Sequence, residues 1–210
     1  MVDIRFVKQG YEIWGIYWHE GYTEPHDFIA TVARTCYKST PKTSDANERL
    51  VRSLIKNGHD AMLEHSFLSV QFLTDRAIAN ELVRHRHFSF AQESTRYVNS
   101  AKRGFEFIIP QATDTEEASN IRDACEQSAA LYEYMVSEHG TKPEIARAVL
   151  PLCTATTIVC SGNFREWRHA LKLRTAKDAH PQMRALMTPL LIELREQIPI
   201  VFDDIEVTDA

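Results

Sequence analysis

The sequence lacks both of the common glycine-rich motifs that bind phosphate through backbone N–H groups, GxGxxG and GxxxxGK. A phosphate-containing ligand would therefore have to be bound by side chains. Arginine suits this role because its planar guanidinium can donate two parallel hydrogen bonds to one anion. The candidates are sufficient for two anionic ligands, and they are Arg84, Arg86, Arg96, Arg147, Arg165 and Arg174.

Long apolar runs and an excess of positive charge are also missing. No run approaches the roughly 18 apolar residues of a membrane-spanning helix, and the start, MVDIRFVKQG, lacks the apolar core of a signal peptide. We therefore expect a cytoplasmic protein without a membrane segment. The formal net charge is -5 and the pI is about 6.0. Non-specific nucleic-acid binding depends on broad basic surfaces, so we expect no nucleic-acid partner.

Cysteine is scarce, and the four cysteines show no CxxC spacing. In a chain without an export signal, Cys36, Cys125, Cys153 and Cys160 should be reduced thiols, and burial in the core is the role expected for them. A catalytic cysteine stays open as an alternative at this point, because a thiolate is a strong nucleophile.

The chain has the length and composition of one globular domain, with 44% hydrophobic and 25% charged residues and no internal repeat or long linker. For residues 1–210 we predict a single α+β domain with a mostly antiparallel sheet flanked by helices. Alternating apolar residues predict a strand over 66–72, and a run rich in β-branched residues predicts one over 154–161. Apolar runs predict further strands around Val7 and over 13–17 and 105–109. Apolar residues at helical spacing predict helices over 27–36, 45–58, 121–140, 145–150, 164–174 and 181–197.

Two of these helices carry a sequence pattern typical of a capping box at the N-terminus. Asp45 with Glu48 and Thr141 with Glu144 have the required spacing. In the helix over 164–174, we expect Phe164, Trp167 and Leu171 to face the core, while Arg168 and Lys172 face water.

The stretch Arg84–Tyr97, RHRHFSFAQESTRY, combines more anion-binding side chains than any other segment. The helical spacing of Ile78, Leu82 and Val83 predicts a helix end just before Arg84. The three residues of 84–86 would leave it about 100° apart and surround a ligand. If the segment beyond is extended, Ser94 and Arg96 point to the same face, as a phosphate site requires. The alternative is a helix end with solvated basic residues paired to acidic neighbours, Glu81 and Glu93.

This stretch resembles the signature of the flavin-dependent thymidylate synthases. The resemblance includes the spacing of Arg84, His85, Arg86, Ser94 and Arg96, and it extends over most of residues 57–174. The further segments that carry it are GHDAMLEHSFLSVQF, EFIIP, IARAVLPL and SGNFREWRHALKLR. It implies an enzyme that converts deoxyuridine monophosphate (dUMP) to thymidylate, with methylenetetrahydrofolate as carbon donor and NADPH-reduced FAD as hydride donor. It also implies a homotetramer whose active sites draw residues from more than one subunit.

The resemblance also implies roles for particular residues. It places Arg174 beside the uracil ring, where a fixed positive charge would make it the electrostatic catalyst. We expect Ser94 to bind rather than to act as a nucleophile, because the nearby sequence contains no evident activating base. The residues implied to bind FAD are His59, Ala61, Arg84, His85, Arg86, Gln92, Asn163, Phe164, Arg165 and His169. Those implied to bind dUMP are Glu81, Arg84, Gln92, Glu93, Ser94, Thr95, Arg96, Arg147 and Arg174.

The chain departs from the family pattern at several of these positions. Glu81 replaces a frequent glutamine, and its carboxylate would repel a phosphate unless it is paired or protonated. Gln92 replaces a frequent glutamate, and Ala61 replaces a hydroxyl residue, which leaves only backbone contacts there. The spacing beyond Arg174 also differs, so no role is transferred to His180.

Two other functions stay open. The first is a non-catalytic nucleotide-binding or regulatory homologue that has kept the binding residues without the chemistry. The second is a zinc hydrolase, because imidazole and carboxylate groups are ordinary zinc ligands. The candidate zinc ligands are His59, Glu64, His65, His85 and His87. Their spacing does not match HExxH, so we predict that no metal is bound.

Overall fold

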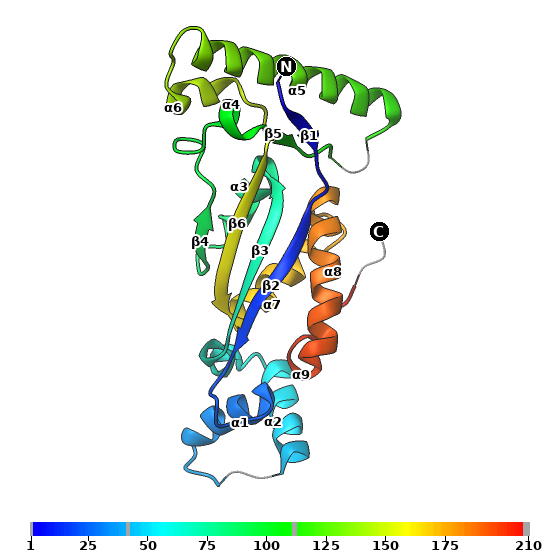
Figure 1. Ribbon diagram of the computed structural model, residues 1–210. Coiled ribbons are helices and arrows are strands. Elements are labelled where there is room, and N and C mark those ends of the chain that lie inside the picture. Colours follow the sequence, from blue (N-terminus) through cyan, green and yellow to red (C-terminus); the bar gives the residue numbers. More distant parts are fainter. Residues whose placement is uncertain (1, 41–42, 111–112, 208–210) are drawn as a thin grey trace. The chain divides into compact units, whose positions relative to one another are not determined.

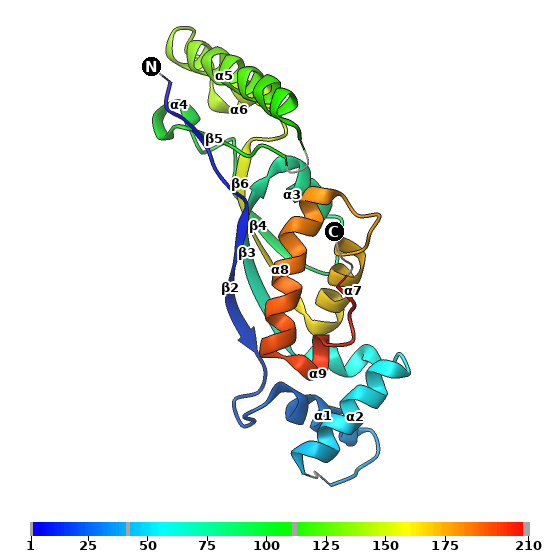
Figure 2. The same ribbon diagram turned by 90° about the vertical axis from the view of Figure 1, so that its right-hand side faces the viewer.

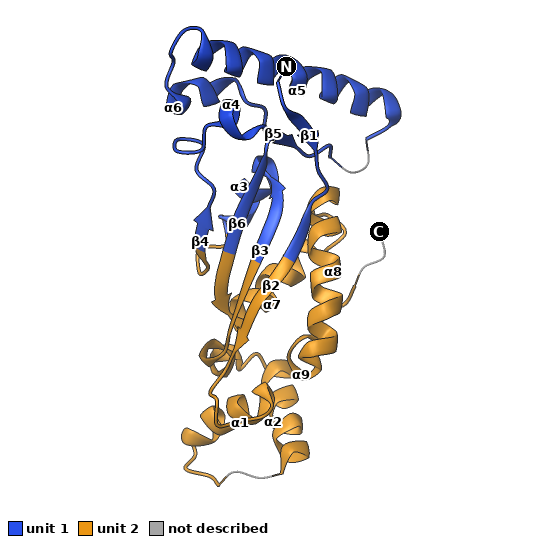
Figure 3. Cartoon of the chain, in the orientation of Figure 1, with its two compact units in different colours: residues 1–11, 71–84, 90–159 blue, residues 12–70, 85–89, 160–210 orange. Residues whose placement is uncertain are grey.

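The computed structural model describes residues 2–40, 43–110 and 113–207, and it confirms the α+β class with an antiparallel sheet and surrounding helices (Figure 1). The chain forms two compact units (Figure 3). The first unit comprises residues 1–11, 71–84 and 90–159, and the second comprises residues 12–70, 85–89 and 160–210. The single domain expected from the sequence stays a prediction.

The four-stranded sheet has the order β2-β3-β6-β4, formed by Gly10–Tyr17, Phe67–Asp75, Ala155–Asn163 and Ser89–Gln92. Strand β3 confirms the predicted alternation, because Leu68, Val70 and Phe72 are fully buried whereas Phe67 is exposed. Strand β6 alternates in the same way. A period of two places successive side chains on opposite faces, and only one face of these strands is fully buried.

The first unit contains a second, two-stranded sheet in which β1 (Ile4–Phe6) pairs in parallel with β5 (Phe105–Phe107). Its core combines β5 with α5 (Thr115–Ser137), where Phe105 and the buried Tyr132 meet edge to face. Asp114 and Glu117 form a capping box that starts α5. The remaining helical elements of the unit are α3 (Arg76–Leu82), α4 (Ser100–Arg103), α6 (Pro143–Ala146) and the 3-10 turn η2 (Arg147–Val149).

The second unit is mainly helical. Helices α7 (Phe164–Arg174) and α8 (Pro181–Gln197) lie on one side of the sheet strands (Figure 2). The short α9 (Pro199–Phe202) contacts α8 and α2 (Ser44–Lys56), which packs on α1 (Pro25–Thr35). The 3-10 helix η1 (Asp60–His65) contacts both α1 and α7. This arrangement places η1 and α7 next to each other.

The buried stripe of α7 is the one that the sequence predicted. Phe164, Trp167 and Leu171 have no exposed surface. Trp167 Nε1 also donates to the Leu68 carbonyl of β3 over 2.9 Å, so its one polar group is satisfied in the core. Burial of each large side chain stabilises the fold by about 1.5–3 kcal/mol, which fixes α7 against the sheet.

Both capping boxes predicted near α2 and α6 are wrong. Thr43 is the N-cap of α2, which puts Asp45 inside the helix. Lys142 is the N-cap of α6, one residue after the predicted Thr141. Proline fits best at the first helical position, so Pro143 sets the start of α6 instead.

The cysteines differ in environment more than predicted. Cys125 and Cys160 are buried and Cys153 is half-buried, but Cys36 is exposed. All four are free thiols, and the sulfur atoms of Cys125 and Cys153 lie 3.3 Å apart. The expected burial therefore holds for Cys125 and Cys160, in part for Cys153, and not for Cys36.

Candidate active site

A single residue joins the sheet to the helix that carries most of the candidate site. Asn163 is the last residue of β6 and the N-cap of α7. Its side-chain oxygen accepts a hydrogen bond from the Glu166 backbone N–H over 2.9 Å, which is typical of an N-cap residue. Side chains at the start of α7 are therefore fixed relative to the strand.

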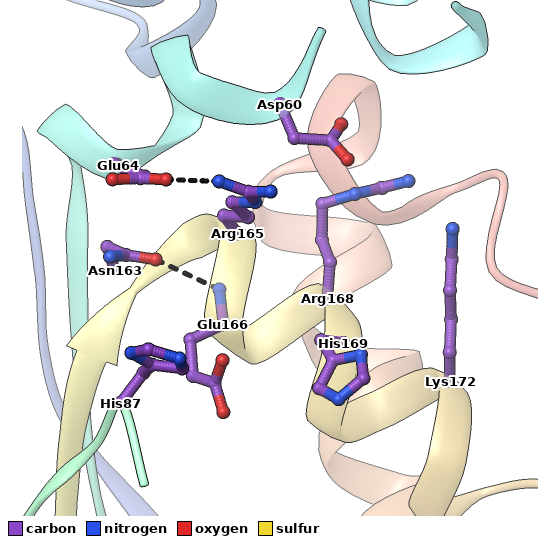
Figure 4. A pocket seen from close by; sticks show the side chains of 9 residues that line it. All are labelled: Asp60, Glu64, His87, Asn163, Arg165, Glu166, Arg168, His169 and Lys172. Carbon is purple, nitrogen blue, oxygen red and sulfur yellow. Dashed lines mark hydrogen bonds and ion pairs between the residues drawn. The ribbon is translucent and has the colours of Figure 1, made fainter. Parts of the chain in front are cut away.

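A cavity of about 540 Å³ opens beside this junction within the second unit (Figure 4). The volume lies in the range of small-molecule and cofactor sites, about 300–1,000 Å³. Three residues predicted to bind FAD line it: Asn163, Arg165 and His169. The other lining residues are Asp60, Glu64, His87, Glu166, Arg168 and Lys172.

The cavity lining includes an arginine, Arg165, whose ion pair can be replaced by a ligand. Arg165 donates to Glu64 over 2.5 Å, and both side chains are about half exposed. Exposed ion pairs of this kind contribute at most about 1 kcal/mol, so an anionic ligand could take over the guanidinium at little cost. The cavity lining has no net formal charge, because three carboxylates (Asp60, Glu64 and Glu166) balance three cations (Arg165, Arg168 and Lys172). Binding of a diphosphate therefore requires Arg165 to leave Glu64 and pair with the ligand.

Arg168 does not face water, and this sequence prediction is wrong. Its side chain is only 5% exposed and forms two hydrogen bonds with Asp204, over 2.6 and 2.7 Å. It also donates to the Val201 carbonyl. Arg168 therefore attaches α7 to the segment that follows α9, in addition to lining the cavity. Lys172 is about half exposed, as predicted.

Arg174, the predicted catalyst, ends α7 and is half-buried. Its Nε donates to Nε2 of His85 over 2.9 Å. His85 is itself 6% exposed, and burial, together with the charges of Arg174 and His169, lowers its pKa to about 4. The imidazole is therefore neutral at neutral pH. The ring of His85 lies 6.1 Å from that of His169, which lines the cavity.

The predicted fan of Arg84, His85 and Arg86 divides by exposure. Helix α3 ends at Leu82, and the two arginines are exposed, whereas His85 points into the second unit. Phe88 anchors this segment with its ring 4.6 Å from that of Trp167. A Cβ on Gly162 would lie 2.2 Å from the Phe88 ring, so this close packing requires glycine in β6.

The predicted dUMP residues of the first unit make a second cluster. Ser94 and Arg96 lie in a turn, not in an extended segment, because the Ser94 carbonyl accepts from both the Tyr97 and Val98 backbone N–H groups. The Arg96 N–H donates to the Ser94 hydroxyl over 3.3 Å. Arg147 donates to Thr95 over 3.2 Å, which brings two predicted residues together. Arg96 also lies 3.9 Å from Glu144.

The remaining predicted residues fall into the same two groups. In the second unit, His59 and Ala61 are exposed near the start of η1, and Arg86 is exposed in the segment 85–89. The first unit contains Glu81, Arg84, Gln92 and Glu93, with Glu93 and Thr95 lining a smaller cavity of about 240 Å³. The side chain of Phe164 packs against Phe202 in the core, so only its backbone could approach a ligand.

Sequence reasoning missed most of the cavity lining, although a signal was present. Residues 165, 168, 169 and 172 follow the three- and four-residue spacing that places side chains on one helical face. That face contains the predicted Arg165 and His169, so Arg168 and Lys172 belonged with them. Asp60 and His87 reach the cavity from other segments, which no local spacing reveals.

Two general findings concern the described residues alone. Among residues 2–40, 43–110 and 113–207, no group of three or more His, Cys, Asp or Glu side chains is arranged to hold a metal ion. Within the same ranges, every helix is too short or too polar to cross a membrane.

The sequence of this chain matches a known protein family. Residues 20–200 match the family model described as Thymidylate synthase complementing protein, Thy1. The chain therefore belongs to the Thy1 family of flavin-dependent thymidylate synthases.

Individual relatives bear the name flavin-dependent thymidylate synthase. The protein of Corynebacterium aurimucosum is 34% identical over 217 residues, which cover 92% of this chain and 86% of the relative. The protein of Mycobacterium tuberculosis is 34% identical over 202 residues, which cover 86% of this chain and 79% of the relative. The protein of Corynebacterium diphtheriae is 32% identical over 205 residues, which cover 88% of this chain and 80% of the relative.

Proposed function

We propose that this protein catalyses the reductive methylation of dUMP to thymidylate, with methylenetetrahydrofolate as carbon donor and NADPH as reductant of bound FAD. The observation that carries the proposal is the position of Arg174 in a chain of this family. Its guanidinium is half-buried and held at the end of the helix that lines the large cavity. A protein that only bound nucleotides would not need a fixed charge at that place.

The large cavity of the second unit fits FAD by its size and its donors. Asn163 and His169 offer polar groups at its wall, and Arg165 offers a guanidinium whose pairing with Glu64 is weak. Bidentate arginine contacts suit a diphosphate. His59, the Ala61 backbone, Arg84, His85, Arg86, Gln92 and the Phe164 backbone complete the proposed FAD-binding set. Bound FAD, once reduced by NADPH, would supply the hydride.

For dUMP, the first unit supplies a turn with a hydroxyl and two arginines. Ser94 and Arg96 share this turn, and Arg147 reaches it through Thr95. We assign the phosphate to these groups, with Glu81, Arg84, Gln92 and Glu93 as further contacts. Ser94 has a binding role, because an unactivated hydroxyl is a weak nucleophile.

Arg174 supplies the electrostatic part of catalysis. Beside the uracil carbonyl and ring nitrogen, its charge would stabilise the negative charge that develops as C5 becomes nucleophilic. A preorganised charge lowers such a barrier without having to reorganise during the reaction. The positive charge is permanent, since a guanidinium does not lose its proton in proteins.

We also propose a homotetramer. Trp14 of β2 and Phe67 of β3 are about half exposed on neighbouring strands. Large exposed apolar side chains favour contact with another protein surface. A second copy of the chain is the partner that the family resemblance implies.

The decisive experiment measures thymidylate formed by purified protein with FAD, NADPH, dUMP and methylenetetrahydrofolate, followed by omission of each component. We expect yellow protein, which already carries FAD, and product that depends on each of NADPH, dUMP and methylenetetrahydrofolate. Yellow protein that binds dUMP but forms no product would favour the non-catalytic homologue. Colourless protein that ignores added FAD would refute the proposed cofactor.

A further inference from the structure

His85 lies against one face of α7, between two charged residues of that helix. Its side chain is 5% exposed, and its Nδ1 lies 3.6 Å from a carboxylate oxygen of Glu166. On the other side of the ring, Nε2 lies 2.9 Å from Nε of Arg174. Glu166 and Arg174 are eight residues apart, about 12 Å along the helix axis. The imidazole therefore spans part of the distance between them.

The contact with Arg174 determines where the imidazole proton lies. A guanidinium nitrogen can only donate, so Nε2 of His85 must be the acceptor. A neutral imidazole with a bare Nε2 carries its proton on Nδ1, which is the nitrogen that faces Glu166. The titratable groups around the ring are Glu166, His169 and Arg174, all on α7, and the Phe88 ring lies 6.0 Å away.

We propose that His85 is a positioning residue that fixes the Arg174 guanidinium through this Nε2 contact, with Glu166 orienting the imidazole from the other side. The inference rests on the proposed function, in which Arg174 acts on the uracil ring. An arginine side chain has several rotatable bonds, and small displacements of a catalytic group reduce rate strongly. The Nε contact uses the innermost of the five guanidinium N–H groups and so sets the plane of the fork.

Two amide replacements separate this role from simple packing. The glutamine side chain can place its amide oxygen near the position of Nε2, whereas the shorter asparagine reaches only the position of Nδ1. We expect His85→Asn to lower kcat by about ten- to a hundredfold, with a smaller change in the KM for dUMP. His85→Gln should recover part of that loss. Equal losses in both variants, with FAD retained, would overturn the proposal.

A double-mutant cycle then tests whether His85 acts through Arg174. In the Arg174→Ala protein, His85→Asn should lower kcat by no more than about threefold, because the group that it positions is absent. If His85→Asn costs the same factor with and without Arg174, His85 acts independently and the proposal is wrong. Far-UV circular dichroism shows that each variant remains folded, and the assays are run at saturating FAD.

A substrate-free measurement keeps this inference separate from the proposed activity. In protein labelled with nitrogen-15 at histidine, we expect the His85 ring to be neutral at about pH 7 with its proton on Nδ1. The His85→Gln spectrum assigns the signal, and Arg174→Ala should shift it. A proton on Nε2 would overturn the contact even if thymidylate is formed. The expected tautomer in a protein that forms no thymidylate would confirm the contact and refute the proposed function alone.

Discussion

Arg174 places a guanidinium charge at the end of α7, in hydrogen-bond contact with His85. We predict that Arg174→Ala lowers kcat on the order of a hundredfold or more, which is typical for removal of one preorganised electrostatic group. The variant should stay folded and yellow. Steady-state thymidylate formation provides the measurement, and Arg49→Ala, at an exposed position of α2, provides the control. Near-normal turnover of Arg174→Ala would contradict the assigned role.

The buried His85 should make stability depend on pH. Burial and the charges of Arg174 and His169 lower its pKa from 6.5 to about 4. The unfolded chain therefore binds the proton more tightly, and stability present above pH 6.5 is lost as the pH falls towards 4. The loss amounts to at most about 3 kcal/mol.

Urea unfolding of wild type and His85→Gln, at about pH 7.5 and about pH 5 and one protein concentration, measures this contribution. The variant should lose less stability on acidification than the wild type. His139→Gln, at an exposed position after α5, should behave like the wild type. An unchanged pH dependence in His85→Gln would show that this imidazole is not the group responsible.

The four cysteine side chains should be dispensable for catalysis. Burial raises the pKa of Cys160 to about 12. The pKa of Cys125 is raised by its hydrogen bond with Cys153 and by burial. Neither of these thiols therefore forms a thiolate at neutral pH. The hydrogen bond from Cys125 lowers the pKa of Cys153, which makes Cys153 the most critical test. We predict that each single Ser or Ala variant, including that of the exposed Cys36, retains substantial flavin-dependent activity.

The buried cysteines should still cost stability when they are replaced, by about 1–3 kcal/mol each. Thermal unfolding separates this effect from catalysis. One well-folded cysteine variant without activity would point to a nucleophilic thiol and would contradict the proposed mechanism.

At the scale of elements, two neighbouring aspartates after α9 allow a matched comparison. Burial alone would raise the pKa of Asp204, but the hydrogen bonds and charge of Arg168 lower it overall. Asp204→Asn would leave Arg168 buried beside a neutral partner, so we predict a loss of about 2–4 kcal/mol in the free energy of unfolding. Asp203→Asn, which removes the exposed pair with Arg52, should cost at most about 1 kcal/mol. Similar losses in denaturant unfolding would contradict an anchoring role for Arg168.

Periodicity predicted the interiors of elements better than their ends. The final helix, predicted over 181–197 from its apolar spacing, is Pro181–Gln197, and these apolar residues are buried: Met183, Leu186, Met187, Leu190 and Leu194. Helix starts were less predictable. Thr43, not the predicted Asp45, is the N-cap of α2, and Lys142, not the predicted Thr141, is the N-cap of α6. Local sequence offers several capping solutions of similar energy, and tertiary packing selects among them.

Part of the candidate site was predictable because single motifs carry it. The resemblance of the segment SGNFREWRHALKLR to the family identified Arg174 and the residues at the start of α7 as candidates. The environment of Arg168 was not predictable, because its partner Asp204 is 36 residues away. The contact between His85 and Arg174 joins residues 89 positions apart, and no periodicity connects them.

At the scale of the whole molecule, we predict a particle of about four times the 24.1 kDa chain mass by light scattering. Charged residues in an apolar interface weaken association, so Trp14→Glu combined with Phe67→Glu should lower that mass. A wild-type particle with the mass of one chain would refute the tetramer. A double variant that remains tetrameric would show that β2 and β3 do not form the interface.

The direct junction of β6 with α7 has a consequence for length variation in this protein. Asn163 and Phe164 are consecutive, so strand and helix have no spare residue between them. Each residue added there would turn the following helix by about 100° and advance it by 1.5 Å. The directions in which Arg165, His169 and Arg174 leave the helix axis are all set by this junction. A one-residue insertion would displace all three together, although every functional side chain would still be present in the sequence.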